Sequence, residues 1–84
     1  MAQCAERLNQ VSVQVTRNLP RNLRTLMARD GLSARMLGMN LGLARTTVND
    51  RLSGEHAFRA HEVVYLAELF GLTVEELVAD ELPA

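Results

Sequence analysis

A short polar stretch beginning at Arg45 carries side chains that form directed hydrogen bonds. Arg45 can present two parallel N–H donors, and Asn49, one helical turn later, offers a donor beside an acceptor. These arrangements match the edges of guanine and adenine in double-stranded DNA. Thr46 and Thr47 add hydroxyls, with methyl groups suited to thymine, and Asp50 can accept from cytosine or pair with a neighbouring arginine. The stretch therefore predicts chemistry directed at base edges.

Catalysis and metal binding have no comparable set of residues. The single cysteine, Cys4, lies far in sequence from His56 and His61, which are five positions apart. Neither histidine has the cysteine or carboxylate partners that a zinc site or a nucleophilic triad needs. We therefore expect a protein that is not an enzyme and that has no metal, no cofactor and no small-molecule ligand.

Charge is unevenly distributed along the chain. All nine basic residues are arginines within residues 1–59, which hold four acids and so carry +5. Residues 60–84 hold six acids and no basic residue, which gives −6. This asymmetry predicts one electropositive face and one acidic face. Arginine without lysine favours planar contacts with phosphates or base edges.

The composition limits the class of protein. A chain of 84 residues allows one domain, and 48% hydrophobic residues with only 4% aromatics predict a core of aliphatic side chains. No apolar run is long enough to span a membrane, and no secretory signal pattern is present. A lone cysteine cannot form an intramolecular disulfide, which suits a reducing compartment. We expect a cytoplasmic protein that does not enter a membrane.

Helical spacing is clear from residue 18 onward. Asn18 is the expected N-cap of a first helix with Pro20 in its first turn, and Gly31 ends it. Ser33 is expected to cap a second helix that ends at Gly42, and a third begins near Ala44. The apolar residues expected inside these three helices are Leu19, Leu23, Leu26, Met27, Leu37, Leu41, Val48 and Leu52.

Two further helices are expected after the loop at residues 54–59. One covers roughly residues 60–70 and ends at Gly71, and Thr73 with Glu76 forms a capping box that opens the last one. Their expected inward residues are Val63, Leu66, Ala67, Phe70, Val74, Leu77 and Val78. The sequence thus predicts an all-α compact bundle of about five short helices.

Residues 34–53 have the spacing of a helix-turn-helix, two short helices joined by a tight turn. Gly38 provides the small residue needed where the helices cross, and Gly42 can adopt the positive φ that opens the turn. Apolar residues stand where the two helices must be locked together: Leu37, Leu41, Leu43 and Val48.

With these motifs, the chain from Asn18 to Val78 resembles the phage repressor and Cro family. The likeness lies in NLRTLMARDGLS, LGLARTTVNDRLSG and LAELFGLTVEEL. The resemblance implies a lambda-repressor-like DNA-binding domain whose third helix, residues 44–53, enters the major groove of operator DNA. The base-reading residues that it implies are Arg45, Thr46, Thr47, Asn49 and Asp50. The implied contacts to the DNA backbone come from Ser33, Arg35, Ser53 and Arg59.

The sequence departs from the family pattern at several positions. Ala34 replaces a glutamine early in the second helix, and Ala44 replaces the usual serine or threonine cap of the third. Met27 and Leu52 stand where the family often has an arginine–glutamate pair, so we expect an apolar contact between them. Arg51 stands where an apolar residue is usual, which suggests a somewhat rotated recognition helix.

Three segments are expected: residues 1–17, a DNA-binding domain at 18–80 and a tail at 81–84. The first segment fits either a strand or a helix, and a strand would need a second copy of the chain. Apolar residues beyond the predicted core suggest a homodimer, unless the last helix or the N-terminal segment covers them. The candidates for its interface are Val11, Val13, Val15, Val64, Leu69 and Leu82, with Tyr65 beside them.

Two functions remain open at this point. The first is a transcriptional regulator, Cro-like or a small prophage repressor, because the sequence ends at Ala84 before a C-terminal oligomerisation domain. The second is the antitoxin of a toxin–antitoxin pair, which combines protein neutralisation with autoregulatory DNA binding. Neither end of the sequence has a long toxin-neutralising tail, which favours the regulator.

Overall fold

Five helices form the regular structure of residues 17–83, the part of the chain that the computed structural model describes. They are a first helix over residues 17–30, α2 (Ala34–Leu41), α3 (Arg45–Ser53), α4 (Ala60–Leu69) and α5 (Val74–Leu77). Residues 17–83 contain no strand. The all-helical fold expected from the sequence is therefore confirmed.

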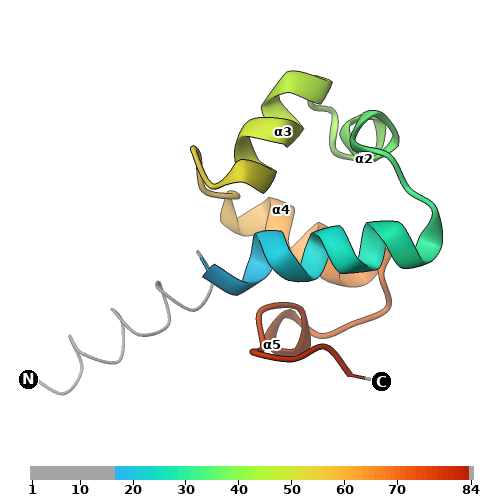
Figure 1. Cartoon of the computed structure of the whole chain (residues 1–84), viewed down its shortest axis with the longest axis vertical. Helices are drawn as coiled ribbons and strands as arrows, with labels where there is room; N and C mark the ends of the chain where they lie inside the picture. The colour runs from blue at the N-terminus through green and yellow to red at the C-terminus, as the bar shows by residue number, and fades with distance from the viewer. Residues whose placement is uncertain (1–16, 84) are drawn as a thin grey trace, which may run out of the picture.

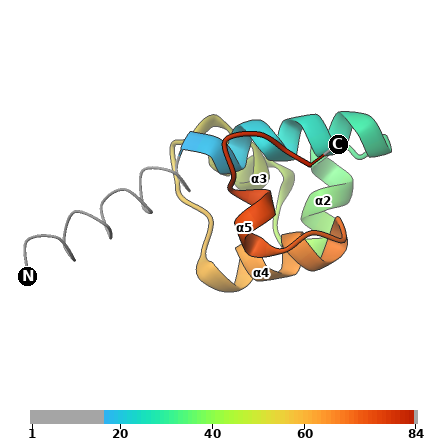
Figure 2. The same cartoon turned by 90° about the horizontal axis from the view of Figure 1, so that it is seen from below.

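The helices are arranged in three levels. Figures 1 and 2 show the first helix and α4 in the middle, with α2 and α3 on one side and α5 on the other. Seen from below in Figure 2, α5 lies across the space between the first helix and α4. The pair α2–α3 thus lies on one side of the first helix and α4, and α5 lies on the opposite side.

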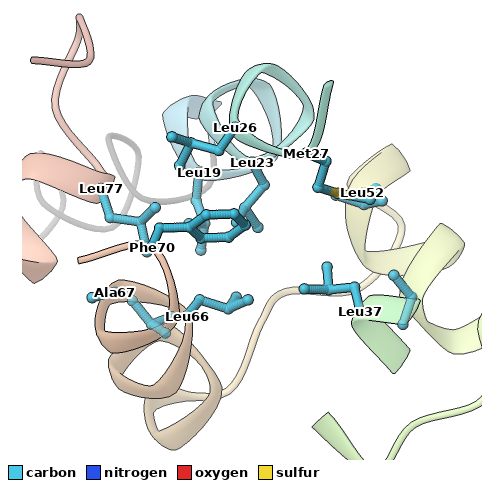
Figure 3. Packing of buried hydrophobic residues seen from close by; sticks show 12 residues of the cluster. Leu19, Leu23, Leu26, Met27, Leu37, Leu52, Leu66, Ala67, Phe70 and Leu77 are labelled. Atoms are coloured by element: carbon cyan, nitrogen blue, oxygen red, sulfur yellow. The ribbon is translucent and has the colours of Figure 1, made fainter. Parts of the chain in front are cut away.

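The core is aliphatic apart from one phenylalanine. Leu23 and Leu66 are fully buried, and the Phe70 ring lies among the leucines of the first helix (Figure 3). The core cluster consists of Leu19, Leu23, Leu26, Met27, Leu37, Val48, Leu52, Val63, Leu66, Ala67, Phe70 and Leu77. Each large aliphatic side chain buried here contributes on the order of 1.5–3 kcal/mol.

The predicted helix ends are largely confirmed. The Ser33 hydroxyl accepts a hydrogen bond from the Met36 N–H at 3.1 Å, and Gly42 ends α2 with a φ of 71°. Thr73 and Glu76 form the expected capping box, with distances of 2.9 and 3.1 Å. Ala44, at the start of α3, provides no side-chain cap.

Two predictions about the helices were wrong. Asn18 is not an N-cap, because Arg17 before it is already helical and the Asn18 amide donates to the Val78 carbonyl instead. Val74 is not inside, because 40% of it is exposed in the first turn of α5. A four-residue helix directs only Leu77 fully into the core, so the neighbouring apolar positions remain near the surface.

Buried amides of the first helix hold the end of α5. Asn22 donates to the carbonyls of Leu77 and Ala79, both at 2.8 Å, and Asn18 donates to the Val78 carbonyl at 3.0 Å. Asn18 also reaches the Asp80 carboxylate at 3.0 Å, and Arg21 donates to the Asp80 carbonyl. We call these contacts of Asn18, Arg21 and Asn22 the C-terminal clasp. They satisfy carbonyls that the short helix leaves without partners.

The crossing of α2 and α3 depends on Gly38. A Cβ atom at this position would lie 2.5 Å from the Leu43 carbonyl oxygen and 3.3 Å from the Val48 Cγ2. The Gly38 carbonyl in turn accepts a hydrogen bond from the Leu43 N–H at 2.8 Å. The expected need for a small residue is confirmed, since the turn backbone occupies the space of any side chain.

We expect Asn22→Ala to lower the free energy of unfolding by about 1–3 kcal/mol, because two carbonyls lose their buried partner. Urea denaturation followed by circular dichroism measures the change. Thr25→Ala, on the exposed face of the same helix, is the matched control and should change stability by less than about 0.5 kcal/mol. Equal stabilities of the Asn22 and Thr25 variants would contradict the clasp.

We expect Gly38→Ala to destabilise the domain by about 1–3 kcal/mol, although alanine is the better helix former, because α2 and α3 must move apart. Asn40→Ala, at an exposed position of the same helix, should be neutral or slightly stabilising. Thermal unfolding of the two variants beside the parent provides the comparison. A Gly38 variant as stable as the Asn40 variant would show that the crossing tolerates a side chain.

Candidate nucleic-acid interface

The predicted base-reading residues lie on the outer side of α3. Arg45, Thr46 and Asn49 are exposed, whereas Thr47 and Asp50 are half-buried. The opposite side of the helix is buried through Val48, Arg51 and Leu52. The helical repeat of 3.6 residues produces this division, since positions 48 and 52 share one side and positions 46, 49 and 50 share the other.

The predicted contacts to the DNA backbone surround this helix in the chain. Ser33 and Arg35 lie at the start of α2, Ser53 ends α3, and Arg59 precedes α4. All four residues are exposed. Within residues 17–83, no hydrogen bond or ion pair engages the guanidinium groups of Arg35 and Arg45, so both have all their donors available.

The two serines differ in what they can donate. The Ser33 hydroxyl oxygen accepts from the Met36 N–H, which leaves its proton for an acceptor outside the protein. The Ser53 hydroxyl instead donates to the Asp50 carbonyl at 2.9 Å. A hydroxyl has one proton, so Ser53 would have to give up this bond before donating to a phosphate.

Asp50 pairs with no arginine in the described residues. The ion pairs within residues 17–83 are Arg29–Asp30 and Arg51–Glu62. At the exposed end of the first helix, the hydrogen bond from Arg29 lowers the pKa of the Asp30 carboxyl. The Asp50 carboxylate therefore keeps its acceptor oxygens, whereas its backbone carbonyl accepts from the Glu55 N–H at 3.0 Å.

A buried ion pair behind α3 was not anticipated. Arg51 Nη1 lies 3.3 Å from Glu62 Oε2, with only 9% and 4% of the two side chains exposed. The inward position of Arg51 is accommodated by this partner, so no rotation of the helix is needed to explain it. The available sequence signal was the occurrence of opposite charges at two core-facing positions, one beside Leu52 and one beside Val63.

Contacts between α3 and the first helix include one predicted pair and one unpredicted bond. Met27 points toward Leu52 in the close view of the core (Figure 3), and both side chains belong to the buried cluster. Both residues are therefore buried and apolar where the family often has an arginine–glutamate pair, as the expected contact between them requires. In addition, Arg24 donates from Nη2 to the Leu52 carbonyl at 3.0 Å, near the end of α3.

Other classes of site find no support in the described residues. No group of three or more histidine, cysteine, aspartate or glutamate side chains within residues 17–83 could hold a metal ion. His56 and His61 are both exposed. None of the described helices combines the length and apolar character needed to cross a membrane.

The dimer candidates occupy different environments. Val64 and Leu69 on α4 are exposed by 49% and 38%, as is Tyr65 by 39%. Successive helical residues differ by 100°, so Tyr65 and Leu69 share one side of α4 and Val64 lies on another. Leu82 packs partly against the core of its own chain. Val11, Val13 and Val15 lie outside the described residues.

Comparison with known proteins places the α2–α3 pair in a family. A family model described as a helix-turn-helix domain matches residues 19–79, nearly the whole described chain. No curated protein and no solved structure matches the sequence. The matched segment includes the Gly38 crossing and the outer side of α3, and this motif binds DNA in the major groove. The chain belongs to the helix-turn-helix domain family.

Proposed function

We propose that the protein is a sequence-specific DNA-binding transcriptional regulator that occupies an operator through residues 44–53. One observation carries the proposal: the outer side of α3 presents Arg45, Thr46 and Asn49 to solvent while Val48 and Leu52 anchor the helix. A helix of this kind fits the major groove of B-form DNA.

Each outward residue type has a base partner. Arg45 at the start of the helix pairs with guanine through two donors, and Asn49 pairs with adenine through its amide. Thr46 and Thr47 contact thymine methyl groups or base acceptors, and Asp50 accepts from cytosine. Within residues 17–83, Asp50 has no arginine partner, which favours the cytosine role over internal pairing.

The DNA backbone contacts come from the flanks of α3. Arg35 and Arg59 supply positive charge to phosphates, and Ser33 supplies its free hydroxyl proton. Ser53 joins them only if it releases the Asp50 carbonyl. These contacts fix the register of the helix in the groove, whereas the residues of α3 select the sequence.

The proposal includes a homodimer as the form that binds the operator. A homodimer would present two α3 helices one turn of DNA apart, about 34 Å, to an operator with inverted repeats. Occupancy would then block or redirect polymerase, as in a Cro-like regulator or a small prophage repressor of the bacterial cytoplasm. The apolar residues Val64, Leu69 and Leu82, with Val11, Val13 and Val15, are the interface candidates.

An antitoxin is the second candidate function. The exposed pair Tyr65 and Leu69 on α4 supports it, because such a strip fits the apolar surface of another protein as well as a second copy. An antitoxin of this fold would also bind DNA through α3. The two functions therefore differ in the protein partner, not in the DNA contact.

Selection of bound duplexes from a random pool tests the proposed function. We expect enrichment of an inverted repeat whose half-sites lie about one helical turn apart. A pool without any enriched sequence would contradict sequence-specific binding. Co-purification of a stable protein partner that the chain inactivates would favour the antitoxin.

We expect Arg45→Ala to weaken binding to the selected operator by about 1–3 kcal/mol and to relax the preference at one base pair.

We expect Arg35→Ala to weaken binding to all duplexes alike and to reduce the slope of log affinity against log salt by about one. Fluorescence anisotropy at several salt concentrations measures both effects. Arg29→Ala, which removes an exposed arginine paired with Asp30, is the charge-matched control. If the Arg45 variant kept the base preference of the parent, Arg45 would not be a base-reading residue.

A further inference from the structure

The apolar anchorage of α3 is small. Of its nine residues, Val48 and Leu52 are the buried apolar ones, and the third buried residue is Arg51. The helix also begins at Ala44 without a side-chain cap. Two apolar side chains on one side hold a helix against its neighbours but resist rotation about its axis only weakly, because apolar contacts have little directionality.

Arg51 joins three segments of the chain. Its Nη1 lies 3.3 Å from Glu62 Oε2 in α4, and its Nε donates to the Ala57 carbonyl in the loop at 3.4 Å. The other oxygen of Glu62 accepts from the Arg59 N–H at 2.7 Å. The carboxylate is therefore fixed at the start of α4. Arg51 Nη1 faces it as an ion-pair partner without a hydrogen bond, so a displacement of Arg51 would leave two buried charges without compensation.

Packing beside Arg51 is incomplete. A partly open pocket of about 70 Å³ lies there, lined by Leu19, Pro20, Arg51, Gly54, His56, Ala57 and Phe58. Apolar close packing therefore does not fix this end of α3. Moreover, replacing a buried ion pair by apolar residues is often neutral or stabilising, so stability alone does not account for the pair.

We propose that the Arg51–Glu62 pair is a positioning device that sets the rotation of α3 about its own axis. The inference rests on the proposed function, because rotation matters most for a helix that reads bases. A turn of about 20° moves a side-chain tip by roughly 2 Å at the outer radius of a helix. That shift is enough to break a two-point hydrogen bond between Arg45 or Asn49 and a base.

The double substitution Arg51→Met with Glu62→Gln tests this positioning role, because glutamine keeps an oxygen that can accept from the Arg59 N–H at the start of α4. It removes one positive and one negative charge, so the net charge and the general attraction to DNA are preserved. We expect a folded domain with an unfolding temperature close to that of the parent, unchanged affinity for random duplexes and about a tenfold or greater loss for the selected operator. Arg29→Gln with Asp30→Asn, which removes an exposed pair away from α3, is the matched control.

A second readout needs no DNA. In the parent, a Val48 methyl group lies close to Gly38, and Met27 points toward Leu52 within the same buried cluster, so both pairs should give NOE cross-peaks. We expect one or both to weaken in the double variant as α3 rotates. Unchanged cross-peaks or unchanged operator affinity would overturn the positioning role. If the parent selects no DNA sequence, the proposed function fails, and the cross-peaks alone decide whether the pair sets the rotation.

Discussion

The close approach of α2 and α3 at Gly38 is the constraint on which the remaining geometry depends. The Leu43 carbonyl occupies the space of a side chain at position 38, and the Leu43 N–H bonds to the Gly38 carbonyl. The turn is therefore fixed from both sides by the same glycine. Val48 packs against this point, so the start of α3 is determined by backbone contact.

The far end of α3 is held by a different kind of interaction. Arg24 reaches the Leu52 carbonyl from the first helix, and Arg51 reaches Glu62 in α4. Arg24 provides a hydrogen bond and Arg51 a buried ion pair, beside the apolar contact of Leu52. A helix held by packing at one end, and by a hydrogen bond and an ion pair at the other, has a defined orientation, and within residues 17–83 its outer side stays exposed.

Sequence patterning predicted the helices, the turn and the core with few errors. Amphipathic spacing and glycine positions are local signals, and the burial of Leu23, Leu37 and Leu66 follows from them. The hydrogen bonds and the ion pair between distant segments could not be predicted from such local signals. The C-terminal clasp joins residues that are 55 to 62 positions apart, so Asn18 and Asn22 resemble ordinary caps or surface residues until the fold brings α5 to them.

The difference between local signals and long-range contacts also explains which features of the site could be predicted from the sequence. The outward side of α3 followed from its helical repeat, because Val48 and Leu52 identify the inner side and positions 46, 49 and 50 then lie away from it. Arg51 also lies on that inner side, three positions after Val48, but its charged side chain was not expected there. A charged residue on an apolar stripe signals a compensating partner elsewhere, but its identity requires the tertiary structure.

The distribution of charge affects how much of the proposed DNA affinity must come from α3. The acids at 75, 76, 80 and 81 belong to α5 and the segment after it, on the side of the fold opposite α2 and α3 (Figures 1 and 2). In the proposed function this arrangement would turn these acids away from the DNA, yet the net charge of −1 keeps the general attraction weak. Since sequence-independent affinity for DNA arises mainly from phosphate neutralisation, we expect the sequence-independent affinity of this protein for DNA to be low. In the proposed function, the contacts of α3 would then supply a larger share of the binding energy, and this would place a correspondingly strict demand on the orientation of that helix.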